Sequence, residues 1–177
     1  MSKSVFCIAK TSEQAGRIIE QLKLGGFAPN DISVLMADKT GTRDFAIEHS
    51  TKAPEGTTTG ATTGVVVGGI LGWLAGIGAL AIPGLGPLIA AGPIMAALSG
   101  AATVGVLGGI TGALIGLGIP EFEAKKYEGR VKSGSVLISV HSENSTETDR
   151  AKRIFEAAGA EDISSESEAA VPTGSRK

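Results

Sequence analysis

An uncharged stretch of 65 residues, from Gly56 to Pro120, constrains the fold of this chain more than any other feature. It contains no Asp, Glu, Lys, Arg or His, and it holds 18 of the 26 glycines. A block of this kind removes more than a third of the 177 residues from an ordinary protein core. About 110 residues then remain for a soluble unit, which is enough for one domain.

The glycines of this block recur at helical spacing. One row repeats every four residues, and it is formed by Gly56, Gly60, Gly64, Gly68, Gly72 and Gly76. Two shorter rows follow, formed by Ala101, Gly105 and Gly109 and by Gly108, Gly112 and Gly116. On a helix each row is a surface without bulky side chains, where another backbone can approach closely. The spacing predicts glycine-zipper helices whose glycines pack against a neighbouring helix or a second copy of the chain.

Helix-breaking residues separate the two halves of the block. The segment Ile82-Pro83-Gly84-Leu85-Gly86-Pro87 is followed by a further proline, Pro93. Because proline interrupts helices and glycine favours turns, we expect a first helix from Thr57 to Leu80, then a turn, then a second helix. The predicted turn residues are Pro83, Gly84, Gly86, Pro87 and Pro93. The block is therefore predicted to be a helical hairpin.

An internal duplication flanks the block. Three segments of the N-terminal part, Ser4-Val5-Phe6-Cys7, Ala15-Gly-Arg17-Ile18-Ile19-Glu20 and Asp31-Ile32-Ser33, match Ser135-Val136-Leu137-Ile138, Ala151-Lys-Arg153-Ile154-Phe155-Glu156 and Asp162-Ile163-Ser164. In the first copy, Val5 to Ala9 is predicted to be a strand, and Thr11 with Gln14 forms a capping pattern that opens a helix. That helix has one apolar face, made by Ala15, Ile18, Ile19 and Leu22, and it ends at Gly25-Gly26 before a buried strand from Ile32 to Met36.

Two such halves predict an α+β fold of the ferredoxin-like βαββαβ type, with both helices on one face of an antiparallel sheet. The hairpin would be inserted between the second and third strands. We expect residues 1–53 to be the first half with a linker, 54–119 the hairpin, 120–168 a connecting helix with the second half, and 169–177 a flexible tail. Phe122 and Tyr127 are expected on the apolar side of the connecting helix. We also expect residues 4–37 and 134–168 to fold without residues 56–118.

Composition argues against several classes of partner. The 16 basic and 18 acidic residues give a net charge of -2, so we expect no strong positive electrostatic potential that would attract nucleic acid. Cys7 is the one cysteine, so a disulfide within the chain is excluded, and a reducing cytoplasm fits this usage. The N-terminal apolar run is too short for a signal peptide. We expect no cofactor and find no small-molecule substrate indicated.

Local motifs do not assemble into a catalytic or metal site. Asp38-Lys39-Thr40-Gly41-Thr42 matches the phosphorylated loop of P-type cation ATPases, but the further acidic partners and a nucleotide domain are missing. We therefore interpret it as a turn. His49 and His141 lie far apart without other ligands nearby, and Cys7 is expected to be a small buried residue. The chain is predicted not to be an enzyme.

Several blocks resemble a known family. These are Lys52-Ala53-Pro54-Glu55-Gly56-Thr-Thr-Thr-Gly60-Ala, Ala81-Ile82-Pro83-Gly84-Leu85-Gly86-Pro87, Ala90-Ala91-Gly92-Pro93 and Gly118-Ile119-Pro120-Glu121. Together they resemble the bacterial general stress proteins of the 17M-like, heat-induced type, over nearly the whole chain. The resemblance implies a stress-associated protein, often described as a membrane protein, without catalytic residues.

Two interpretations of the hairpin remain from the sequence. In the first, it inserts into or docks on a lipid bilayer, because a helix from Thr57 to Leu80 would be about 36 Å long and a bilayer core is about 30 Å thick. The α/β domain would then stay in the cytoplasm, since basic residues flank both hairpin ends. In the second, the protein is a cytoplasmic, water-soluble homo-oligomer whose apolar helices bury one another. Self-association is expected in both.

Overall fold

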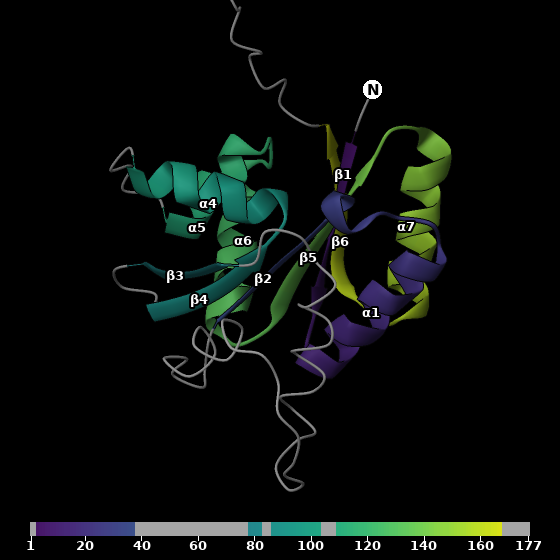
Figure 1. Ribbon diagram of the computed structural model, residues 1–177, viewed down its shortest axis with the longest axis horizontal. Coiled ribbons are helices and arrows are strands. Elements are labelled where there is room, and N and C mark those ends of the chain that lie inside the picture. The colour runs from purple at the N-terminus through teal and green to yellow at the C-terminus, as the bar shows by residue number, and fades with distance from the viewer. Residues whose placement is uncertain (1–2, 38–77, 83–85, 104–108, 168–177) are drawn as a thin grey trace, which may run out of the picture.

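The computed structural model describes residues 3–37, 78–82, 86–103 and 109–167, and these form an α+β fold built on an antiparallel sheet (Figure 1). The sheet has six strands in the order β3-β4-β2-β5-β1-β6. In chain order the strands are β1 Lys3–Ala9, β2 Ile32–Ala37, β3 Gly78–Ile82, β4 Gly86–Ala91, β5 Val136–Ser142 and β6 Glu161–Ser167. The helices are α1 Ser12–Leu24, α4 Pro93–Thr103, α5 Gly109–Gly116, α6 Glu121–Lys132 and α7 Ser145–Ala157, with a 3-10 turn, η1, at Pro29–Asp31.

Both copies of the duplicated unit fold as strand, helix and strand, as the repeated sequence predicts. Thr11 opens α1 by accepting a hydrogen bond from the Gln14 amide, and Asn144 opens α7 by accepting one from the Glu147 amide. Gly26, which follows the C-cap residue Gly25 of α1, has a φ of 90°, a value that favours glycine. The first strands of the two copies then pair with each other, with Cys7 opposite Ile138.

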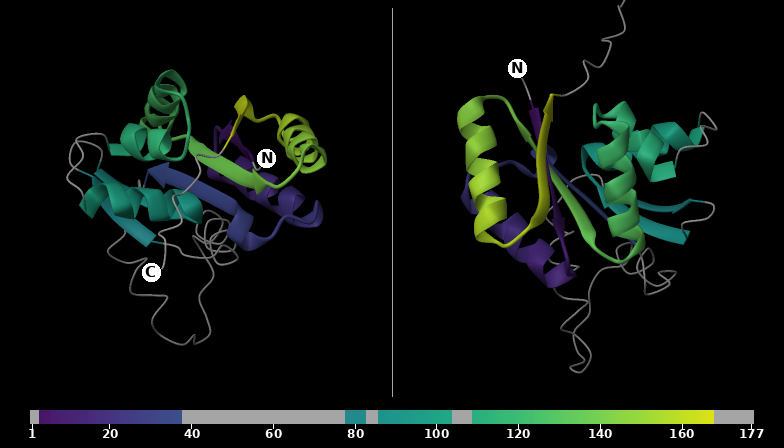
Figure 2. Two further views of the ribbon diagram at one scale, coloured as in Figure 1. Left: turned by 90° about the horizontal axis from the view of Figure 1, so that it is seen from above. Right: turned by 180° about the vertical axis from the view of Figure 1, so that it is seen from behind.

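One face of the sheet is covered by α1 and α7, as the duplication predicts (Figure 2). The predicted apolar face of α1 is buried. It packs with Phe155 of α7 and with every second side chain of the central strands, including Val5, Cys7 and Ile138. This arrangement follows from the alternation of side chains along a strand, because residues two apart point to the same face.

The other face is covered by α4, α5 and α6, and this layer corrects the predicted domain division. Ile94, Ile110 and Leu114, all from the uncharged block, have no exposed surface and pack with Phe6 and Leu137 of the central strands. In this layer α6 packs on β5 and β2, α4 packs on β2 and β4, and α5 packs on α4 and α6. Buried residues from 88–98 and 110–119 are therefore part of the domain core, and for these segments the expectation of a separate hairpin at 54–119 does not match the packing.

A β-hairpin replaces part of the predicted helical hairpin. The predicted helix from Thr57 to Leu80 is wrong at its C-terminal end, because Gly78–Ile82 is strand β3. Gly86 and Pro87, predicted as turn residues, belong to strand β4. Pro87 lies just before Leu88, where the pairing of β4 with β2 begins, so its missing N–H does not interrupt that ladder. Pro83 and Gly84 lie outside the described residues.

The connecting helix is present as α6, but the prediction that Phe122 lies on its buried side is wrong. Its buried residues are Ala124, Tyr127 and Val131, whereas Phe122 is 81% exposed. Tyr127 follows Phe122 by five positions, which is about 140° around a helix of 3.6 residues per turn. The two aromatic side chains therefore cannot share a face. Strand β6 continues to Ser167, and the predicted tail at 169–177 lies outside the described residues.

Candidate functional site

Most of the predicted glycine-zipper residues lie outside the described part of the chain. These are Gly60, Gly64, Gly68, Gly72, Gly76, Gly105 and Gly108. Their packing role remains a prediction. The remaining three, Gly109, Gly112 and Gly116, lie on α5. Pro93, predicted as a turn residue, is the first residue of α4.

The three glycines of α5 have different surroundings. Gly109 begins the helix with a φ of 50°. Gly112 lines a groove between α5 and α6. A Cβ atom built at Gly116 would meet nothing within 4 Å, so Gly116 packs against no described neighbour within the chain. Gly116 is thus not a contact that holds α5 to another described element.

The groove between α5 and α6 has a volume of about 520 Å³ and mixed lining. Its residues are Thr111, Gly112, Ile115, Glu121, Lys125, Glu128, Gly129 and Lys132. The Glu128 carboxylate accepts hydrogen bonds from the amide of Thr111, at 3.0 Å, and from its hydroxyl, and it pairs with Lys132 at 2.6 Å. Partial burial alone would raise the pKa of Glu128, but the hydrogen bonds from Lys132 and Thr111 outweigh it and lower that pKa. These polar contacts tie α5 to α6.

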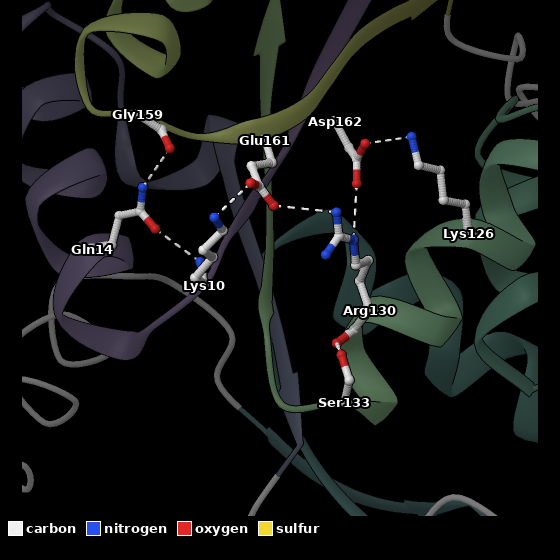
Figure 3. A network of polar contacts seen from close by, with 8 residues as sticks. All are labelled: Lys10, Gln14, Lys126, Arg130, Ser133, Gly159, Glu161 and Asp162. Carbon is white, nitrogen blue, oxygen red and sulfur yellow. Dashed lines mark hydrogen bonds and ion pairs between the residues drawn. The ribbon is translucent and has the colours of Figure 1, made fainter.

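A network of ion pairs joins α6 to the start of β6 (Figure 3). The Asp162 carboxylate accepts a hydrogen bond from Arg130 Nε at 3.0 Å and pairs with Lys126. Glu161 pairs with Arg130 at 3.2 Å and with Lys10 at 2.6 Å. The Asp162 side chain is only 13% exposed, and its φ of 51° is unusual for a residue with a side chain.

The Asp162 backbone is held from a second direction by Tyr127 of α6. The buried Tyr127 hydroxyl donates to the Asp162 carbonyl at 2.9 Å and lies 2.8 Å from the Ser164 hydroxyl. Burial raises the pKa of Tyr127. The duplication predicts a strand from Ile163, but it does not predict this network, because the partners come from α6, which has no counterpart in the repeat.

The thiol predicted to be buried is confirmed as such. Cys7 has no exposed surface, and desolvation raises its pKa, so the thiolate form is disfavoured. Among the described residues, no three His, Cys, Asp or Glu side chains gather as metal ligands. His141 lies on β5, while His49 and the segment 38–42 fall outside the described ranges.

Comparisons with known proteins add no family assignment. The chain matches no family model, no curated protein and no solved structure. Within the part of the chain that the structure describes, none of the helices combines the length and the apolar character that a membrane crossing requires.

Proposed function

We propose that this protein is a non-enzymatic, self-associating protein whose contact segment is the glycine-rich run at residues 56–77. The observation that carries the proposal is the pairing of β4 with β2, together with the complete burial of Ile94 and Leu114. These contacts use the second half of the uncharged block for the core of the chain's own sheet. The long row from Gly56 to Gly76 has the spacing of a helix-contact surface, and we infer that it contacts a second copy of the chain.

The sheet topology supports contact between copies over a membrane-crossing hairpin. Strand β2 ends at Ala37 and β3 begins at Gly78, and both belong to one sheet. A segment that leaves the sheet after Ala37 must return on the same side of any membrane before Gly78. Two crossings would need about 40 apolar residues at about 20 per helix. Residues 38–55 carry charges, among them Asp38, Lys39 and Glu55, so only one run of sufficient length is left.

The finer fold class is part of this proposal. The order β2-β5-β1-β6, with α1 and α7 on one face, supports a ferredoxin-like βαββαβ unit with the glycine-rich block inserted between its second and third strands. In this proposal the inserted block has two roles: its second half forms a layer on the sheet, and residues 56–77 form the contact segment. The resemblance to bacterial general stress proteins supports a stress-associated role.

The experiment is a measurement of mass by light scattering on a sizing column, for the full chain in the absence of detergent. We expect an oligomer for the natural sequence and a smaller particle for the double variant Gly68→Leu/Gly72→Leu, because leucine side chains would keep packed helices apart. Gly129→Leu is the control, since a Cβ at Gly129 meets nothing within 4 Å. A monomeric natural chain, or an equally large assembly of the double variant, contradicts the proposal.

Docking on a lipid bilayer without crossing it is the second candidate. It is favoured by the uncharged run at 56–77 and by Trp73 within it, because tryptophan partitions to the membrane interface. Flotation of the full chain with lipid vesicles separates the two candidates. Flotation that the two leucines leave unchanged or strengthen, with a monomeric protein in the absence of lipid, supports docking rather than self-association.

A further inference from the structure

A groove runs between the two duplicated helices, α1 and α7, on the face of the sheet opposite α4, α5 and α6. Its volume is about 590 Å³, and it is lined by Arg17, Gln21, Arg150, Arg153, Ile154, Ala157 and Ala158. That volume falls within the range of roughly 300–1,000 Å³ that small-molecule sites occupy. We call it the arginine groove.

The charge of the arginine groove is unbalanced. Three guanidinium groups line it, and no carboxylate does. Five of the other basic side chains in the described part pair with carboxylates, namely Lys10, Lys125, Lys126, Arg130 and Lys132. No described carboxylate pairs with Arg17 or Arg153. Arg150 also lines a second pocket with Asp31, Glu143 and Glu147, so the absence of carboxylates applies to the arginine groove itself.

The duplication places two of these arginines at equivalent positions. Arg17 follows Ala15 by two residues in α1, and Arg153 follows Ala151 by two residues in α7. The two helices pack together, so the equivalent guanidinium groups line one groove. The third arginine is held in place, because Arg150 Nη1 donates to the Gly25 carbonyl at 2.9 Å. Holding a side chain before a ligand binds lowers the entropy cost of binding.

We propose that the arginine groove binds a phosphate-bearing anion. Guanidinium groups form paired hydrogen bonds to phosphate oxygens, and three of them match several negative charges better than one. The apolar side chains of Ile154 and Ala157 form the uncharged part of the lining. The phosphate comes either from a soluble polyphosphate or from the headgroup of an anionic lipid. This proposal does not depend on the glycine-rich segment.

The test is titration calorimetry of the full chain with sodium tripolyphosphate, at low salt. The double variant Arg17→Gln/Arg153→Gln is compared with Lys125→Gln/Lys132→Gln, which removes the same charge from α6 on the other face of the sheet. We expect the affinity to fall at least about tenfold for the groove variant and less than about twofold for the control. Flotation with phosphatidylcholine vesicles, with and without phosphatidylglycerol, tests the lipid source on the same proteins.

Each outcome bears on the proposal. Selective loss of tripolyphosphate binding supports a soluble ligand, and selective loss of flotation with the phosphatidylglycerol vesicles supports a lipid headgroup. Absence of binding to both probes, or an equal loss in the two double variants, overturns the proposal. Thermal unfolding confirms that the variants are folded, and Arg17→Lys/Arg153→Lys repeats the test with the charge retained. Because oligomer mass is measured without phosphate, failure here is distinct from failure of the self-association proposal.

Discussion

Gln14 and Arg150 occupy equivalent positions in the two copies of the duplicated unit, and each binds carbonyl groups at the C-terminal end of the other copy's helix. Gln14 Nε2 donates to the carbonyls of Ala158 and Gly159, at 3.0 and 2.8 Å. Arg150 Nη1 donates to the carbonyl of Gly25. The last carbonyls of a helix have no partner within it, so these side chains satisfy them and pin the helix pair at both ends.

Replacement of Gln14 by alanine tests this contact. We expect Gln14→Ala to lower the free energy of unfolding by about 1–2 kcal/mol. The substitution removes the two hydrogen bonds that Gln14 Nε2 donates to carbonyls and the one that Oε1 accepts from the Lys10 amide. Urea denaturation measures the change. Gln21→Ala, an exposed glutamine of the same helix, is the control and should change stability by less than about 0.5 kcal/mol. Equal effects of the two substitutions would show that the cross-helix contact adds nothing.

Gly92 and Gly129 form a second matched pair. A Cβ at Gly92 would lie 2.3 Å from the Ile32 carbonyl oxygen, and the φ of Gly92 is 74°, so Gly92→Ala should cost at least about 2 kcal/mol of stability. Gly129 lies inside α6, where a Cβ meets nothing, so Gly129→Ala should raise stability by about 0.5–1 kcal/mol through helix propensity. Thermal unfolding of both variants checks the two opposite signs. A harmless Gly92→Ala would contradict the close approach of the turn before α4 to β2.

Asp162 makes stability depend on pH in the acid range. Its pKa is lowered from an ordinary value of 3.8: desolvation opposes the shift, but the contacts with Lys126 and Arg130 outweigh it. The folded state therefore favours the ionised carboxylate, and the stabilisation is present above pH 3.8 and lost as the pH falls through the folded-state pKa.

We expect Asp162→Asn to destabilise the protein by about 1–2 kcal/mol at pH 7 and by progressively less below pH 4. Urea unfolding at several pH values measures this, with Glu121→Gln, from an exposed pair, as the control without effect. A constant difference across pH would exclude the ionised pair as the cause.

Two internal deletions test which part of the uncharged block belongs to the domain. Removal of residues 56–77 should leave a folded protein, because β3 and β4 remain in the sheet and α4 and α5 remain in the layer that covers it. Removal of residues 56–118 should expose the Leu35 and Leu137 side of the sheet and give an aggregating or loosely packed protein. Circular dichroism and amide hydrogen exchange distinguish the two. A well-protected protein from the longer deletion would restore the division of domains expected from the sequence.

The residues of the candidate site were predictable only in part. The buried state of Cys7 follows from its place among apolar residues in a strand, and the equivalence of Arg17 and Arg153 is visible in the repeated helix sequence. The network around Asp162 is not visible there, because Lys126 and Arg130 come from a helix outside the repeat and meet Asp162 only after the sheet has formed. The glycine row at 56–76 can be recognised by spacing alone, but spacing does not identify the surface that it contacts.

The sequence by itself determined the two β-α-β copies and the packing of their helices, α1 and α7, on one face of the sheet. In those segments the central strands are short apolar runs, the helices have an apolar face at the helical period, and Thr11 and Asn144 mark the helix starts locally. Only the tertiary structure decided that Gly78–Ile82 and Gly86–Ala91 are strands and that α4 and α5 cover the second face. Glycine, alanine and scattered branched residues have no polar positions to define a period, so local sequence does not separate a helix from a strand there. The edge of β2 that β5 does not cover favours a strand over a helix at Gly86–Ala91, because its backbone N–H and C=O groups gain hydrogen-bond partners from β4. The start of α4 is tied to the same strand, because the Ser33 hydroxyl accepts a hydrogen bond from the Ile94 amide.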